Sequence, residues 1–117
     1  MPDPCRHPKN IIDAFYLIWE NYPEPAMLVH KNEQVAAANP ACSGQGHKIH
    51  CLSLDYGVTP KQNQELAGQA LADQRPMFVK KRRKQAEITI YWMPVNGYPD
   101  YYIHFIAGSP EAENKQA

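Results

Sequence analysis

Residues 77–106 read MFVKKRRKQAEITIYWMPVNGYPDYYIHFI, and this stretch decides the fold. It is rich in the β-branched and aromatic residues that favour strands. Three apolar runs are separated by two polar turns: 77–81, 87–93 and 101–106, with turns at 83–86 and 96–99. This pattern predicts three consecutive antiparallel strands.

The stretch before these strands predicts a helix. Thr59 is a good N-cap, Pro60 suits the first helical position, and Pro76 stops the helix after Gln74. Further upstream, residues 26–30 and 34–38 read as two short strands joined by a polar turn.

Two shorter segments complete the prediction. Asn39 and Pro40 predict a cap and the start of a helix of about one turn. Residues 10–20 read NIIDAFYLIWE, with apolar side chains at helical spacing behind a possible N-cap at Asn10. This N-terminal helix is expected to be amphipathic and to end before Pro23.

The order of elements predicts the fold class, an α+β domain. We expect a five-stranded antiparallel sheet with helices on one face and an N-terminal amphipathic helix. The domain is expected to span residues 10–108, with flexible segments at 1–9 and 109–117, which are polar or rich in proline.

Composition limits the classes of function. The 117 residues carry 12 basic and 12 acidic side chains, a formal net charge of +0, so nucleic acid is an unlikely partner on electrostatic grounds. No signal sequence or membrane-spanning stretch is visible, which predicts a cytoplasmic protein that does not bind membranes. Three cysteines do not resemble a disulfide framework, so reduced thiols are expected.

Two segments resemble the PAS domain family. Residues 21–41, NYPEPAMLVHKNEQVAAANPA, are similar to its opening, where a proline turn enters the first strand and Asn-Pro-Ala caps the first short helix. Residues 90–95 and 101–105 are similar to its last two strands. The resemblance implies a sensory, ligand-binding or dimerising module, of the kind commonly attached to a kinase, cyclase or transcription factor. None of those effectors is recognisable in this sequence.

The cofactor, if any, stays unknown. Haem-sensing members of the family ligate iron through a histidine on the helix before the last three strands, and residues 60–74 contain none. The flavin-binding members carry an Asn-Cys-Arg-Phe-Leu-Gln-like helix that has no counterpart in this sequence. Haem remains an alternative through one of four histidines: His30, His47, His50 or His104.

Ligand-binding positions follow from strand alternation and helical spacing. The alanine-rich second strand leaves room above the sheet, and aromatic residues at 91, 92, 101 and 102 are typical of ligand pockets. The predicted binding set is Leu28, Ala36, Ala38, Leu66, Ala70, Ile90, Trp92, Ile103 and Phe105, with Ile88 on the same predicted face. Ordinary core packing is the alternative for each of them.

Four metal-ligand side chains fall within ten residues: Cys42, His47, His50 and Cys51. Cysteine and histidine are the usual ligands of Zn²⁺, so a metal or redox site is a hypothesis. The spacing matches no standard zinc signature, and a buried cysteine beside solvent-facing histidines is the alternative.

The run Lys80-Lys81-Arg82-Arg83-Lys84 could contact phosphate or an acidic partner. A solvated strand end whose charge protects against aggregation is the simpler interpretation.

Sequence motifs for catalysis are missing, so we expect a protein that is not an enzyme. Two functions remain. The first is a signalling domain that binds a small apolar or amphipathic ligand between the sheet and the helices. The second is an interaction module without a ligand, and a signalling partner protein is possible. Under either function we expect a homodimer through the N-terminal helix and the sheet.

Overall fold

The computed structural model describes residues 8–45, 57–83 and 86–108, and the two predicted terminal segments lie largely outside them. Five strands form one antiparallel sheet in the order β2-β1-β5-β4-β3. The strands are β1 (Ala26–His30), β2 (Val35–Ala38), β3 (Met77–Arg83), β4 (Ala86–Val95) and β5 (Tyr98–Ala107). The predicted α+β architecture is confirmed.

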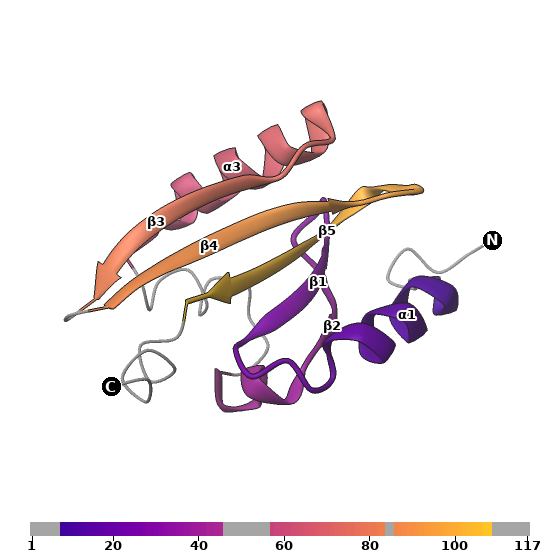
Figure 1. Cartoon of the computed structure of the whole chain (residues 1–117). Helices are drawn as coiled ribbons and strands as arrows, with labels where there is room; N and C mark the ends of the chain where they lie inside the picture. Colours follow the sequence, from indigo (N-terminus) through magenta and orange to yellow (C-terminus); the bar gives the residue numbers. More distant parts are fainter. Residues whose placement is uncertain (1–7, 46–56, 84–85, 109–117) are drawn as a thin grey trace.

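Three helical segments accompany the sheet: α1 (Lys9–Trp19), the short 3-10 helix η1 (Pro40–Gln45) and α3 (Pro60–Asp73). Figure 1 shows α3 running along β3 and β4, while α1 lies beside β1 and β2 at the other end of the sheet. The described helices are too short or too polar to cross a membrane.

The predicted start of α3 is confirmed in detail. The Gln62 backbone N–H donates to the Thr59 hydroxyl at 3.1 Å, and the Thr59 N–H donates to the Gln62 side chain at 3.1 Å. These reciprocal bonds form a capping box, with Pro60 in the first turn. The helix ends at Asp73, and Gln74 follows as the C-cap residue with a left-handed φ of 52°.

The predicted N-cap of α1 is wrong. The helix starts at Lys9, behind Pro8, so Asn10 lies inside it. Pro8 is the N-cap residue, its φ of −59° is the value that its ring fixes, and no side chain caps the helix. Lys9 and Asp13, one turn apart, form an exposed ion pair at 2.7 Å.

The side chain of Asn39 ties α1 to the sheet. It is 1% exposed, and its Oδ1 accepts the Ala26 N–H at 3.0 Å. Its Nδ2 donates to the carbonyl oxygens of Trp19 at 3.3 Å, Tyr22 at 3.2 Å and Glu24 at 2.9 Å. One buried amide therefore satisfies the backbone of the linker from α1 to β1.

The sheet has a hydrophobic core on each face. The core under α3 includes Met27, Ile90 and Trp92, whereas the core under α1 includes Leu28 and Phe15. Since neighbouring residues of a strand point to opposite faces, Met27 and Leu28 lie on opposite sides of the sheet. Helix α1 thus covers the face that α3 leaves open.

Candidate functional site

A small group of polar side chains lies inside the core between α3 and the sheet. Trp92 on β4, His104 on β5 and Asn63 on α3 are each 0% exposed, and Tyr102 on β5 is 1% exposed. We call these four residues the buried polar cluster.

The α3 sequence brings Asn63 to this position. Asn63, Ala67 and Ala70 are spaced i, i+4 and i+7, so they share the helix face that packs on the sheet. The indole N–H of Trp92 donates to Asn63 Oδ1 at 2.9 Å. A tryptophan N–H needs a partner when it is buried, and this helix supplies one.

A backbone carbonyl and neighbouring aromatic rings hold His104. Its Nδ1 lies 3.0 Å from the Tyr91 carbonyl oxygen, which selects the tautomer whose Nδ1–H donates. The imidazole stacks on the indole of Trp92 with centroids 4.8 Å apart. Burial lowers the pKa of His104 to about 4, although the Tyr91 carbonyl opposes this shift. The ring is therefore uncharged near neutral pH.

The phenol of Tyr102 is the fourth member of the cluster. Its hydroxyl is buried and has no hydrogen-bond partner within the described part of the chain. Burial, and to a smaller extent the charge of Glu33, raises the pKa of Tyr102 above its ordinary value. The group is therefore a neutral phenol. A buried hydroxyl without a partner is unusual, because most buried polar atoms in proteins have one.

The structure separates the predicted ligand-binding residues into two sets. Ala38, Leu66, Ala70, Ile90 and Trp92 lie in the core under α3, together with Ile88. Leu28, Ala36, Ile103 and Phe105 lie in the core under α1. The expectation of one shared face is wrong, because β1 and β5 are buried on both sides and carry no alternation of apolar and polar residues.

The predicted aromatic lining divides in the same way. Trp92 and Tyr102 lie under α3, while Tyr101 lies under α1 and Tyr91 stacks on Phe105 with centroids 4.8 Å apart. A role in ligand binding remains a prediction for the residues on the α3 side.

The predicted metal motif falls mostly outside the described residues, which exclude His47, His50 and Cys51. Cys42 is buried, and its thiol lies 3.4 Å from the Ala26 carbonyl oxygen. Burial raises the pKa of Cys42, which disfavours the thiolate that binds metal. Among the described residues no three His, Cys, Asp or Glu side chains are grouped to hold a metal ion. The metal hypothesis stays a prediction.

Sequence reasoning named His104 only as an alternative haem ligand, and it missed Asn63. His104 is a polar residue in an otherwise apolar strand, and Asn63 is a polar residue on the apolar stripe of α3. In both places the sequence shows a polar residue where the pattern of the strand or helix calls for an apolar one.

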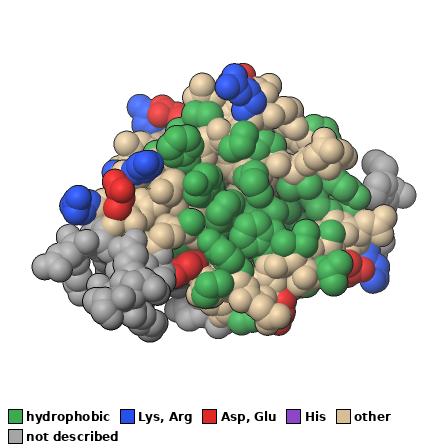
Figure 2. Space-filling model, viewed as in Figure 1, with side chains coloured by type: hydrophobic (Ala, Val, Ile, Leu, Met, Phe, Trp, Pro, Cys, Tyr) green, Lys and Arg blue, Asp and Glu red, His purple; other side chains and the backbone are tan. Residues whose placement is uncertain are grey.

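The other face of the sheet is aromatic and only partly covered. Phe105 contacts Trp19 of α1 at a centroid distance of 4.8 Å, and Phe78 of β3 lies 5.9 Å from Tyr91. Phe78 is 54% exposed. Figure 2, in the view of Figure 1, shows hydrophobic side chains gathered in one broad area, with charged side chains mainly at its rim.

Comparison with known proteins identifies the fold. No family model and no curated protein matches the chain. A solved structure of a sensory box sensor histidine kinase from Vibrio cholerae matches with a TM-score of 0.56 and 10% identity, covering 91% of this chain and 98% of that one. A domain of an HTR-like protein from Haloarcula marismortui ATCC 43049 matches with a TM-score of 0.47 and 13% identity, covering 74% and 95%. The likeness to the Vibrio cholerae structure shows a PAS-like α+β fold.

Proposed function

We propose that this chain is a sensory domain that binds a small, uncharged, amphipathic ligand between α3 and the sheet. The observation that carries the proposal is the Tyr102 hydroxyl, which is buried in the α3-side core without a hydrogen-bond partner among the described residues. A ligand with one hydrogen-bonding group would satisfy it and recover the energy that burial costs.

The charges around the cluster favour an uncharged ligand. The buried polar residues of the described chain are Asn39, Asn63 and His104, and none is an acid or a permanent cation. His104 is neutral because burial lowers its pKa. An ionised ligand would lose its hydration here without gaining a counter-ion, which costs several kcal/mol.

Native mass spectrometry and thermal denaturation test the proposal. We expect the purified protein either to carry extra mass or to gain thermal stability from members of a panel of uncharged amphipathic compounds, since ligand binding stabilises the folded state by mass action. Tyr102→Phe should lower that affinity about tenfold, the effect of one lost hydrogen bond.

Tyr98→Phe is the matched control, because Tyr98 packs in the core under α1. It should bind like the wild type. The proposal fails if no compound binds, or if Tyr98→Phe and Tyr102→Phe weaken binding equally.

Homodimerisation is a second candidate function, and a specific observation favours it. Leu17 is 87% exposed and Ile18 is 69% exposed on α1, although the opposite side of the same helix, at Ile11 and Phe15, is buried against the sheet. Ala14, which is also exposed, completes an i, i+3, i+4 stripe with Leu17 and Ile18. A second copy of the chain would cover this stripe by two-fold symmetry, and the net charge of +0 opposes no such contact.

A further inference from the structure

β3 forms an open edge of the sheet. The strand pairs with β4 along its whole length, from Met77 opposite Trp92 to Arg83 opposite Ala86, and pairs with no other described strand. Its seven residues span about 23 Å at the usual strand rise. The other edge, β2, has four residues and lies against α1. An open edge presents backbone N–H and C=O groups that an additional strand can pair with.

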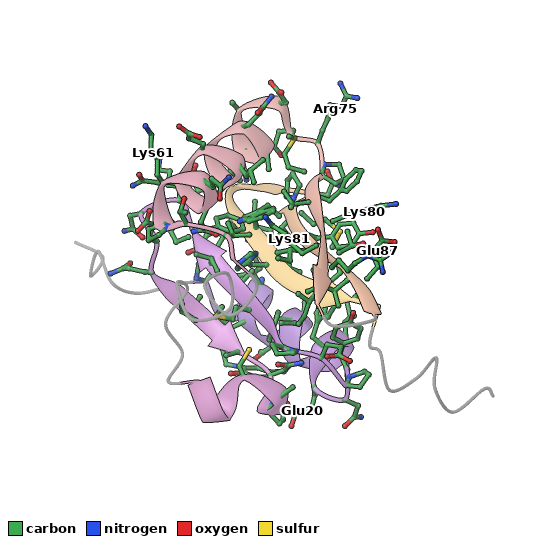
Figure 3. All side chains as sticks on the ribbon, turned by 90° about the vertical axis from the view of Figure 1, so that its left-hand side faces the viewer. Glu20, Lys61, Arg75, Lys80, Lys81 and Glu87 are labelled. Atoms are coloured by element: carbon green, nitrogen blue, oxygen red, sulfur yellow. The ribbon has the colours of Figure 1, made fainter. Side chains whose placement is uncertain are left out.

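The same edge carries cations that the described chain does not neutralise. Lys80, Lys81 and Arg82 are consecutive in β3, and the two ion pairs found among the described residues are Lys9–Asp13 and Lys31–Asp100. Figure 3 shows Lys80 and Lys81 pointing in different directions, with Glu87 on the side of Lys80. Glu87 is the single acidic residue of β4, and it lies opposite Arg82.

Protection against edge-to-edge aggregation explains one or two lysines on such a strand, but it explains this run less well. The cations occupy successive positions, so they point alternately to both faces of the sheet. An added strand would meet positive charge above and below its own backbone. Phe78, on the same strand and 54% exposed, offers an apolar contact beside them.

We propose that the β3 edge binds an extended acidic segment of a partner protein, which adds to the sheet as a sixth strand. Backbone hydrogen bonds hold the segment, and its carboxylates face Lys80, Lys81 and Arg82. Charge complementarity selects the partner, because the run is basic in a chain with no net charge. A protein segment fits this edge better than nucleic acid, because a phosphate backbone has no N–H and C=O groups to continue the ladder.

The test uses the full chain and a fluorescein-labelled peptide of repeated Glu-Glu-Thr, which places carboxylates on both faces of an added strand. A peptide of repeated Lys-Lys-Thr is the probe control. Fluorescence anisotropy should show that the acidic peptide binds and that the basic peptide does not. Binding of the acidic peptide should weaken as the salt concentration rises from about 0.05 M to about 0.5 M. Lys80→Glu should weaken binding about tenfold. Lys61→Glu is the matched charge change on α3, which Figure 3 places on the other side of the molecule, and should change binding less than about twofold.

Amide hydrogen exchange of the same complex reports the strand addition. We expect amides of β3 to exchange about tenfold more slowly with the peptide bound, while amides of β2 are unchanged. The proposal is overturned if the acidic peptide does not bind, if Lys61→Glu weakens binding as much as Lys80→Glu, or if binding leaves β3 exchange unchanged. Binding of an oligothymidylate in place of the peptide would identify the edge as a nucleic-acid surface and also overturn it.

Discussion

Each face of the sheet has a buried core, but the two faces are covered to different extents. Under α3, Ile90 and Trp92 are 0% exposed, and the indole N–H of Trp92 donates to Asn63 Oδ1. On the side of α1, Leu28 is also 0% exposed, but Phe78 on β3 is 54% exposed. The side chains under α3 are therefore enclosed, whereas the α1 side is covered only in part, which is typical of a contact surface.

Removing one aromatic ring from each face should give the largest difference in the free energy of unfolding between two variants. We expect Trp92→Ala to lower the free energy of unfolding by about 4 kcal/mol, because it leaves a cavity and removes the donor bound by Asn63. Phe78→Ala should cost less than about 1 kcal/mol, since half of that ring is already in water. Urea denaturation measures both. Similar losses for the two variants would contradict the difference between the faces.

Acid should lower the stability of the folded protein, because His104 in the core under α3 becomes protonated. Its pKa is about 4 in the folded protein, lowered from 6.5, so between these values the unfolded state binds more protons than the folded state. The stability that the neutral ring contributes is fully present above pH 6.5, and it is lost progressively as the pH falls to about 4. The loss amounts to about 3 kcal/mol.

Urea denaturation at a series of pH values measures this loss. His104→Phe cannot titrate, so the stability of this variant should fall less steeply between pH 6.5 and pH 4. Identical slopes in the variant and the wild type would assign the acid sensitivity to other groups.

The smallest effect on stability is expected on the outer side of α1. Leu17→Gln should change the free energy of unfolding by less than about 0.5 kcal/mol, because the side chain is 87% exposed. The same change should convert the proposed dimer to monomer in sedimentation equilibrium. Lys61→Gln is the control on α3. A dimer that survives the combined Leu17→Gln and Ile18→Gln change would not be held by α1.

The sequence predicted the elements well where local signals were strong. Thr59 and Pro60 marked the start of α3, and the alternation of Ile88, Ile90 and Trp92 gave the correct face of β4. In β1 no such alternation exists, because Ala26 to Val29 are all buried. A strand covered on both sides cannot reveal from its own sequence which residues face which helix.

The candidate site was harder to predict than the fold. The buried polar cluster depends on contacts between residues far apart in the chain, such as Trp92 and Asn63, which are 29 positions apart. No local pattern encodes that pairing. The sequence did contain a histidine within an apolar strand. Such an exception to the pattern can indicate a site as a motif does.

The amide of Asn39 has a mechanical consequence. It follows directly after β2, yet it holds the backbone of the segment that leaves α1. Tyr22, in that segment, also donates its hydroxyl to the Ile106 carbonyl oxygen at 2.6 Å, on β5. Helix α1 cannot pivot on its linker without breaking these bonds. The helix is therefore fixed to the sheet by its linker. Any tilt of the β1–β2 hairpin would also move the exposed stripe of Ala14, Leu17 and Ile18.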